Sequence, residues 1–244
     1  MKPYAVYRDL GQMRYARALE VQQREFDALL ARKARGGDED DGYAGTIFTV
    51  EHPAVYTLGK NGNAANMLAD GERLKSSGAE FFRTDRGGDI TFHGEGQIVG
   101  YPILDLERTG TGLREYIEVL EQAVIDTVAE YGIASGRSKG ASGVWLGEGA
   151  DGIGRSGGSV GQKGLLRKIC AIGVRASRYV TMHGFALNVT TDLGRFGLIN
   201  PCGFSDRGVT SMERELGYAP DIDEVKIKVV TRLAERLNIE LRHI

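Results

Sequence analysis

Hydrophobic residues recur along this chain in two different periods, and each period predicts a different kind of element. A period near 3.6 residues, typical of an amphipathic helix, runs through 15–34, 113–131 and 221–237, and it is most regular in 113–131. Shorter segments that alternate or are apolar throughout predict strands. These strands are expected at 3–8, 46–51, 55–58, 79–83, 98–106, 143–146, 168–176 and 180–189, with a short helix near 211–216.

The order of these elements predicts the fold class. Strands outnumber long helices and follow one another directly, and the short turn between 168–176 and 180–189 predicts a hairpin. The sequence has no internal repeat and no strict alternation of strand and helix. We therefore expect a single α+β domain over residues 1–244, with a mostly antiparallel or mixed sheet covered by helices.

Two segments show no hydrophobic period. Residues 36–42 are acidic and glycine-rich, and residues 147–164 hold eight glycines in eighteen positions. Such compositions are typical of solvated loops, and we expect the second to be flexible.

Composition narrows the classes of partner. The net charge of −2 over 244 residues argues against a nucleic-acid partner. No signal peptide and no apolar run of about 18 residues occur, which favours a soluble cytoplasmic protein with no membrane partner. Two cysteines are too few for a disulfide framework, and four scattered histidines argue against a structural zinc site. We expect neither a metal nor a cofactor.

Residues 86–101 combine polar side chains with a strand pattern and are interrupted by Gly87, Gly88, Gly94 and Gly96. Glycine permits a positive φ and lets another molecule approach the backbone, and it costs conformational entropy where it has no such use. The segment is therefore interpreted as the wall of a binding site. The alternative is a tight hairpin around a buried histidine whose hydrogen bonds are satisfied.

Cys202 is the first candidate for covalent chemistry. It stands between a proline and a glycine, a turn sequence that presents a side chain on a rigid support. Such a thiol is a candidate nucleophile or metal ligand, although a loop cysteine without a role fits the same position. With an ordinary pKa near 8.5, only a few per cent of it is thiolate at pH 7, so a nucleophilic role requires a neighbouring cation or base.

Lys168 is the leading candidate for that cation, because it begins an otherwise apolar strand. The strand pattern by itself favours a lysine that snorkels to solvent from the strand end over a buried one. His93 and His183, each followed by a glycine in a strand-like segment, are rival bases. Regular alternation places Cys170 on the same face as Lys168, yet a small core residue is the more common state of a strand cysteine.

Together these residues resemble the lipoyl(octanoyl) transferase family. The resemblance covers about residues 1–220 and lies in 86–94 with Gln97 and Tyr101, in 168–174, in 183–188 and in 200–203. His52, Pro53 and 143–145 also resemble family positions. Two features depart from the family pattern: Glu95 stands where a proline is common, and the glycine-rich stretch before Lys168 is longer than usual.

The resemblance implies a fold shared with biotin and lipoate protein ligases and an acyltransferase of protein lipoylation and lipoate biosynthesis. It implies that octanoyl-acyl carrier protein is the donor, and that the acceptors are lipoyl domains of 2-oxoacid dehydrogenase complexes and the glycine cleavage H protein. It also implies that Cys202 carries an octanoyl thioester and that Lys168 lowers the Cys202 pKa and shuttles protons. The implied acyl-substrate wall consists of Arg86, Gly87, Gly88, Asp89, Ile90, Thr91, Phe92, His93, Ala171, Ile172, Gly173, Gly184, Phe185 and Ala186.

Two other functions remain open from the sequence. An ATP-dependent lipoate or biotin protein ligase would share the fold but would need no cysteine. A catalytically silent acyl-binding or scaffold domain would also not need Cys202. For a transferase, we further expect that a side chain placed at Gly88 or Gly184 blocks the acyl slot without unfolding the protein.

Overall fold

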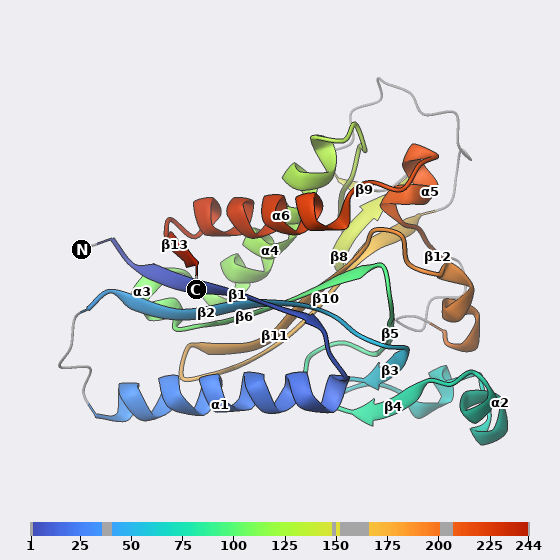
Figure 1. The fold of residues 1–244 in the computed structure, drawn as a ribbon, viewed down its shortest axis with the longest axis horizontal. Coiled ribbons are helices and arrows are strands. Elements are labelled where there is room, and N and C mark those ends of the chain that lie inside the picture. The colour runs from blue at the N-terminus through green and yellow to red at the C-terminus, as the bar shows by residue number, and fades with distance from the viewer. Residues whose placement is uncertain (1, 36–40, 148–149, 152–165, 201–206, 244) are drawn as a thin grey trace.

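The computed structural model describes residues 2–35, 41–147, 150–151, 166–200 and 207–243 (Figure 1). The main sheet contains β1 (Tyr4–Gln12), β2 (Tyr43–Glu51), β6 (Gln97–Leu104), β7 (Gly136–Ser138), β8 (Ala141–Leu146), β9 (Ala150–Asp151), β10 (Arg167–Ser177), β11 (Val180–Asn188), β12 (Gly208–Val209) and β13 (Glu240–His243). A smaller sheet contains β3 (Val55–Leu58), β4 (Glu80–Arg83) and β5 (Ile90–His93). The helices are α1 (Tyr15–Ala34), α2 (Gly71–Ser76), α3 (Leu106–Thr109), α4 (Leu113–Ala129), α5 (Met212–Leu216) and α6 (Ile222–Arg236), with 3-10 turns η1 (Ala64–Asn66) and η2 (Leu193–Leu198).

The main sheet is mixed, as the sequence predicts. Its strand order is β13-β1-β2-β6-β11-β10-β8-β7-β9, and β12 pairs with β10. β1 pairs in parallel with both β13 and β2, and β12 is parallel to β10, whereas the other pairs are antiparallel. The predicted hairpin is present as β10 and β11, and its turn residues Arg178 and Tyr179 both have positive φ, which matches the twist of a tight hairpin.

Helices cover both faces of the main sheet, so the chain has two core layers. α1 lies along one face, and α4 and α6 lie on the other (Figure 1). Phe26 and Leu29 of α1 pack with Phe48 and Met182 of the sheet. The larger core lies under α4 and α6, where their apolar stripes meet the opposite face of the same strands. These stripes are the periodic positions seen in the sequence, because burial of one helical face requires that spacing.

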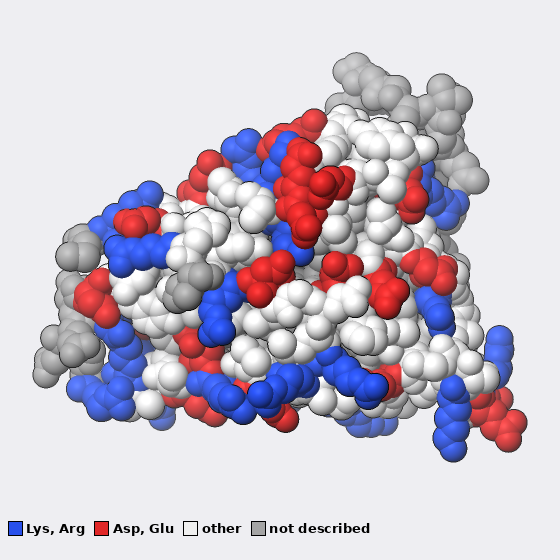
Figure 2. All heavy atoms as spheres, viewed as in Figure 1, with Lys and Arg blue, Asp and Glu red and all other residues white. Residues whose placement is uncertain are grey.

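The outer surface carries interspersed charges. Figure 2 shows Lys and Arg side chains along α1 next to acidic groups, and acidic side chains over the start of α6. Several of these charges are paired, for example Arg17 with Glu20 on α1. None of the helices in the described part of the chain is long and apolar enough to cross a membrane.

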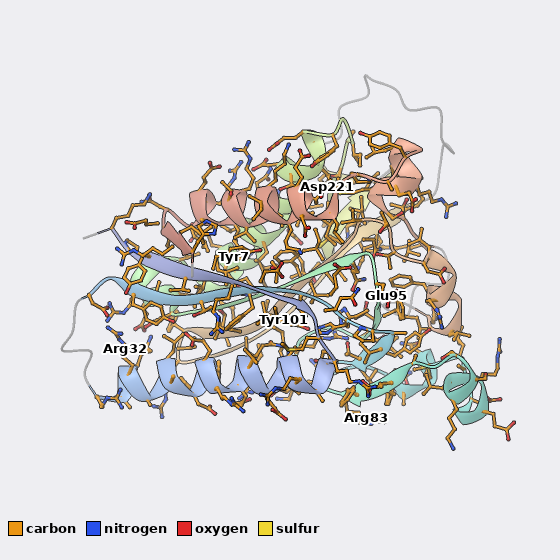
Figure 3. All side chains as sticks on the ribbon, viewed as in Figure 1. Tyr7, Arg32, Arg83, Glu95, Tyr101 and Asp221 are labelled. Carbon is orange, nitrogen blue, oxygen red and sulfur yellow. The ribbon has the colours of Figure 1, made fainter. Side chains whose placement is uncertain are left out.

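The predicted elements agree with the observed ones to within a few residues. Helix 15–34 and strand 55–58 have the predicted bounds, and helix 113–131 ends two residues earlier, at Ala129. The interpretation of 86–101 as a tight hairpin is wrong, because β5 pairs with β3 in the small sheet while β6 pairs with β2 and β11 in the main sheet. The chain therefore crosses from one sheet to the other at 94–96, where Glu95 is exposed (Figure 3).

Candidate active site

A cavity of about 340 Å³ is lined by residues of both sheets and of the segment before β5. β10 and β11 supply part of its lining, and the segment from Arg86 to His93 with parts of β6 supplies another part. Residues from the start of α1 and from the β7–β8 turn complete it. The lining residues are Tyr15, Asn61, Arg86, Gly88, Asp89, Ile90, Thr91, His93, Gln97, Val99, Tyr101, Gly140, Ala141, Ser142, Lys168, Ala171, Ile172, Gly173, His183, Gly184, Phe185, Ala186, Asn188, Phe196 and Val209.

The predicted wall residues line this cavity with two exceptions. Phe92 points away from it and packs with Tyr56 and Phe196 in the core of the small sheet. Gly87 donates its amide hydrogen to the carbonyl oxygen of Val174, 2.9 Å away, and thereby joins the loop to β10. Phe92 points away because side chains alternate along β5, and Gly87 is bonded to β10 because the loop approaches that strand closely. The sequence pattern of this segment could not distinguish these two residues from those that line the cavity.

Two glycines permit the close approach of backbones around the cavity. A Cβ on Gly173 would lie 2.7 Å from the carbonyl oxygen of Gly87, so a side chain there would push the loop away from β10. A Cβ on Gly184 would collide with the carbonyl oxygen of Gly100 in the neighbouring strand. This contact argues against the expectation that a side chain at Gly184 blocks the slot without unfolding the protein, because it would instead disturb the pairing of β11 with β6.

Arg86 fixes the loop that forms one side of the cavity. Its guanidinium is buried and donates to the carbonyl oxygens of Thr57 and Asp89, at 2.6 and 2.8 Å, and to the hydroxyl of Thr57. Its planar fork carries five N–H donors, against three on a lysine ammonium, and so it can bond several acceptors that lie in different directions. Arg86 thus shapes the backbone of the cavity wall.

The Thr57 hydroxyl begins a chain of buried hydrogen bonds. It lies 3.3 Å from Nε2 of His93, whose Nδ1 lies 2.8 Å from Oε1 of Gln97. The amide nitrogen of Gln97 donates to Oδ1 of Asn188, and Asn188 donates to the carbonyl oxygen of Thr210, at 2.8 and 2.9 Å. Because Gln97 donates through its nitrogen, its oxygen accepts from His93, which we therefore assign as the neutral Nδ1–H tautomer.

His93 is a buried histidine with both ring nitrogens bonded. Burial lowers its pKa to about 3, with the nearby charge of Arg86 contributing. His52 lies next to it, 5.9 Å between ring centroids, and burial lowers the pKa of His52 to about 4. The ring nitrogens of His52 lie 2.7 Å from the Met13 carbonyl oxygen and 2.7 Å from the Tyr101 hydroxyl, in the layer between the sheet and α1 (Figure 3). These groups position one another and are neutral at pH 7.

His183 has different surroundings. Its φ of +62° is unusual for a residue with a side chain, and its amide donates to Oε1 of Gln22 on α1 at 3.1 Å. Its ring nitrogen Nε2 lies 2.9 Å from Oδ1 of Asp85, which also pairs with Arg175 at 2.5 Å. Burial lowers the pKa of His183, and the hydrogen bond from His183 lowers the pKa of Asp85, so a neutral imidazole donates to an ionised carboxylate.

Lys168 is buried at the cavity edge, with its Nζ 4.4 Å from the centre of the Trp145 ring. The snorkelling interpretation that the strand pattern favours is therefore wrong. The pairing of β10 with β8 explains its direction: Lys168 is opposite Trp145, and a register shift follows before Cys170 pairs with Val144. This bulge reverses the alternation, so that Lys168 lines the cavity while Cys170 points into the core.

Cys170 is a core residue, as expected for a cysteine in an apolar strand. It is fully buried, and burial raises its pKa to about 12. A neutral buried thiol is a poor nucleophile. Cys202 lies outside the described residues, as does most of the glycine-rich stretch 147–164 and of the loop 36–42.

The β10 edge that faces the loop offers backbone groups to the cavity. The pairing of β8 with β10 ends at Cys170, and the next contact on this edge is the bond from Gly87 to Val174. Backbone groups two residues apart on a strand point to the same side. The amide of Ile172 therefore points to the same edge as the carbonyl of Val174, toward the cavity.

Several lining residues were not predicted from the sequence. Tyr15 reaches the cavity from the first turn of α1 and stacks on His93 with a centroid separation of 6.2 Å. Burial raises the pKa of its hydroxyl to about 12. Ser142 belongs to the turn side of β8, and Phe196 belongs to η2. Tyr15 has no glycine or motif beside it in the sequence, whereas Ser142 and Phe196 each lie within two residues of two glycines that the sequence analysis did not connect to the site.

Comparison with known proteins identifies similar chains. The family model described as lipoyl protein ligase A/B catalytic domain matches residues 14–234. An octanoyltransferase of Bacteroides fragilis is 50% identical over 227 residues, which cover 93% of this chain and 91% of the relative. An octanoyltransferase of Flavobacterium johnsoniae is 48% identical over 236 residues, which cover 96% of each chain.

Among solved structures, a bipartite lipoate protein ligase of Thermoplasma acidophilum matches all of this chain and 87% of its own, with a TM-score of 0.67. The two sequences are 15% identical, so this likeness concerns the fold alone. It agrees with the α+β fold of the lipoate ligases that the sequence resemblance implies.

Proposed function

This chain belongs to the lipoyl protein ligase A/B catalytic-domain family and is an octanoyltransferase, and we propose that it works through a thioester on Cys202. The donor is octanoyl-acyl carrier protein, and the acceptor is a lysine of a lipoyl domain. The lipoyl domains of 2-oxoacid dehydrogenase complexes and the glycine cleavage H protein are the acceptors we propose. The reaction takes place in the cytoplasm, and residues 1–244 act as one catalytic domain.

The position of Lys168 is the observation that carries this proposal. A buried ammonium at the edge of a glycine-lined cavity can stabilise a thiolate and return a proton to a leaving group. Cys202 is the partner thiol, since the second cysteine of the chain, Cys170, is directed into the core. An ATP-dependent ligase would not need this thiol.

The two half-reactions follow from these groups. The thiolate of Cys202 attacks the carbonyl carbon of the donor thioester, and the carrier thiol leaves with a proton from Lys168. The neutral amine of the acceptor lysine then attacks the Cys202 thioester and gives up one proton to the now neutral Lys168, so that an amide forms, the Cys202 thiolate leaves and the Lys168 ammonium is restored. The Ile172 amide is a candidate donor to the oxyanion in both steps, an interaction commonly worth about 3 kcal/mol.

The test is an intact-mass assay with octanoyl-acyl carrier protein, with and without ATP. The parent should gain one octanoyl group without ATP, and Cys202→Ala should gain none. Cys170→Ala is the matched control and should keep most of the adduct, because its thiol is neutral and buried. An adduct on Cys202→Ala would refute the thioester role, and an adduct that requires ATP would favour the ligase.

A further inference from the structure

Trp145 is the only tryptophan in the sequence, and its ring packs against the Lys168 side chain. The two residues are opposite each other in the pairing of β8 with β10. The indole is 2% exposed, and its Nε1 donates to the carbonyl oxygen of Ala141 at 3.2 Å, which fixes the orientation of the ring. A ring held in this way presents a constant face to its neighbours.

Two cations lie against this one ring. The Lys168 ammonium is 4.4 Å from the ring centre, and the Arg207 guanidinium is 5.3 Å from it. Arg207 also donates to the hydroxyl of Ser138 on β7 at 3.4 Å. In the sequence Arg207 follows Cys202 by five positions, a tether of at most about 18 Å. The ring thus contacts both Lys168 and Arg207.

Hydrogen bonds hold the strands next to the ring, β7 and β8, against α4. The amide of Gly143 donates to Oε1 of Glu121 on α4 at 2.9 Å, and Oε2 of the same buried carboxylate accepts from Arg137 on β7 at 2.9 Å. Gly143 has a φ of +116°, and a Cβ there would lie 2.5 Å from the carbonyl oxygen of Cys170 and 3.4 Å from Cε of Lys168. The β7–β8 pair is therefore fastened to α4 in a form that leaves room for Lys168.

We propose that Trp145 is a positioning residue for acyl transfer, whose indole holds the Lys168 ammonium at the cavity edge and also packs against Arg207. This inference rests on the proposed roles of Cys202 and Lys168. An indole face attracts a cation more strongly where water is excluded, and it has no lone pair that would take a proton from the ammonium. Misplacing a reacting group by about 1 Å can cost about 100-fold in rate, so the ring contributes through geometry.

The first test measures single-turnover acylation of Cys202 by intact mass in Trp145→Leu and Trp145→Phe. Trp145→Leu removes the aromatic face and should slow acylation about tenfold or more. Trp145→Phe keeps a weaker face and should lie between this variant and the parent. The pH profile of Cys202 alkylation by iodoacetamide should shift to higher pH in the same order, and kcat should fall while the KM for octanoyl-acyl carrier protein stays near that of the parent.

A second readout uses the fluorescence of Trp145 itself. If Lys168 acts on Cys202 as proposed, acylation replaces a charged thiolate beside the Lys168 ammonium with a neutral thioester, so the emission of the parent should change when octanoyl-acyl carrier protein is added. The Cys202→Ala protein should show no such change. Emission that is identical before and after acylation of the parent would contradict the placement of the ring beside the reacting groups.

Tyr131→Leu is the matched control, because its ring holds Lys228 at 4.9 Å far from the cavity. It should leave the rate and the alkylation profile unchanged. If the parent forms no adduct on Cys202, the proposed function fails. If the parent forms the adduct on Cys202 and Lys168→Met slows its formation, the proposed function stands. If Trp145→Leu then keeps the parent's rate and alkylation profile, the inference about Trp145 alone fails. Should Trp145→Leu not fold, parent-like profiles of both Trp145→Phe and Arg207→Gln would overturn it.

Discussion

The two sides of the cavity are built from different kinds of interaction. On one side, hydrogen bonds run from Thr57 through His93, Gln97 and Asn188 to the backbone of Thr210, and each donor in this series has an acceptor. On the other side, the Lys168 ammonium lies on an aromatic face. A series of matched neutral groups fixes geometry and resists protonation, whereas a cation on a ring keeps its protons available. In the proposed mechanism the first side therefore sets the shape of the cavity, and Lys168 on the second side supplies the proton.

The largest expected effect is on the reactive side. Lys168→Met should slow acylation of Cys202 about a thousandfold, because a positioned acid or base contributes about 10²- to 10⁴-fold. Alkylation of Cys202 should also require a higher pH. Both quantities are measured by intact mass, on protein whose folding is checked by circular dichroism.

Lys226→Met is the control for removing a buried lysine. Lys226 is 5% exposed and pairs with Asp9 and Asp223 at 2.9 and 2.8 Å, on the side of the molecule under α6. Its removal should lower the free energy of unfolding and leave the acylation rate of folded protein unchanged. A parent-like rate in Lys168→Met would move the reactive group to the other side of the cavity.

The next effect is on stability and concerns β11, which lines the cavity beside β10. Gly184→Val should lower the free energy of unfolding by about 3 kcal/mol or prevent folding, because its side chain would collide with the Gly100 backbone. Gly197→Ala is the control, since a Cβ there meets no atom within 4 Å, and it should change stability by less than about 0.5 kcal/mol. Both are measured by urea unfolding. A stable Gly184→Val protein with blocked acylation would restore the slot interpretation.

A smaller effect tests the neutrality of the hydrogen-bonded side. His52 and His93 have pKa values lowered by burial to about 4 and about 3, against about 6.5 unfolded. At a pH between the folded and the unfolded pKa values, the unfolded chain binds more protons than the folded one. The free energy of unfolding is therefore highest above about pH 6.5 and falls as the pH decreases. Each histidine should cost about 1.4 kcal/mol per pH unit in this window.

Urea unfolding at pH 7.5, 6.5 and 5.5 measures this slope above the range in which carboxylates titrate. Between pH 6.5 and 5.5 the loss should be about 2 kcal/mol for the two groups, because each unfolded histidine is only half protonated at pH 6.5. His52→Gln should remove the contribution of one proton, which is at most about 1.4 kcal/mol per pH unit of the slope. A stability that is flat or rises toward pH 5.5 would mean that these histidines are charged in the folded protein.

Much of the fold follows from the sequence because burial imposes a period on it. Helix 15–34 and strand 55–58 were predicted with the observed bounds. The division into two sheets was not predicted, because β5 and β6 share one strand-like pattern and only their pairing partners differ. β13 was missed because its four residues are mostly polar and become a strand only through pairing with β1.

The candidate site could likewise be predicted only where a local sequence pattern encodes it. Glycines and polar residues on one strand-like segment pointed to the cavity wall, since few structural needs explain that composition. The direction of Lys168 could not be predicted, because regular alternation gives the wrong face for Cys170 and the bulge that corrects it depends on pairing with β8. Tyr15 and Ser142 reach the cavity through tertiary packing, which no local pattern encodes.

The smallest expected effect decides between the two candidate bases, Lys168 and His183. In Asp85→Asn the amide oxygen can still accept from Nε2 of His183, and the ion pair with Arg175 that is lost is partly exposed. We therefore expect stability to fall by less than about 1 kcal/mol and the acylation rate to stay within about threefold of the parent. If His183 were the base, its carboxylate partner would stabilise the imidazolium that forms, and the same change would cost up to about 10⁴-fold, as it does in a serine–histidine–aspartate triad. Single-turnover acylation of Asp85→Asn, with Arg175→Gln as the control that removes the ion pair and keeps the carboxylate, separates these outcomes. A large loss in Asp85→Asn alone would place the base on His183 and leave Lys168 an electrostatic role only.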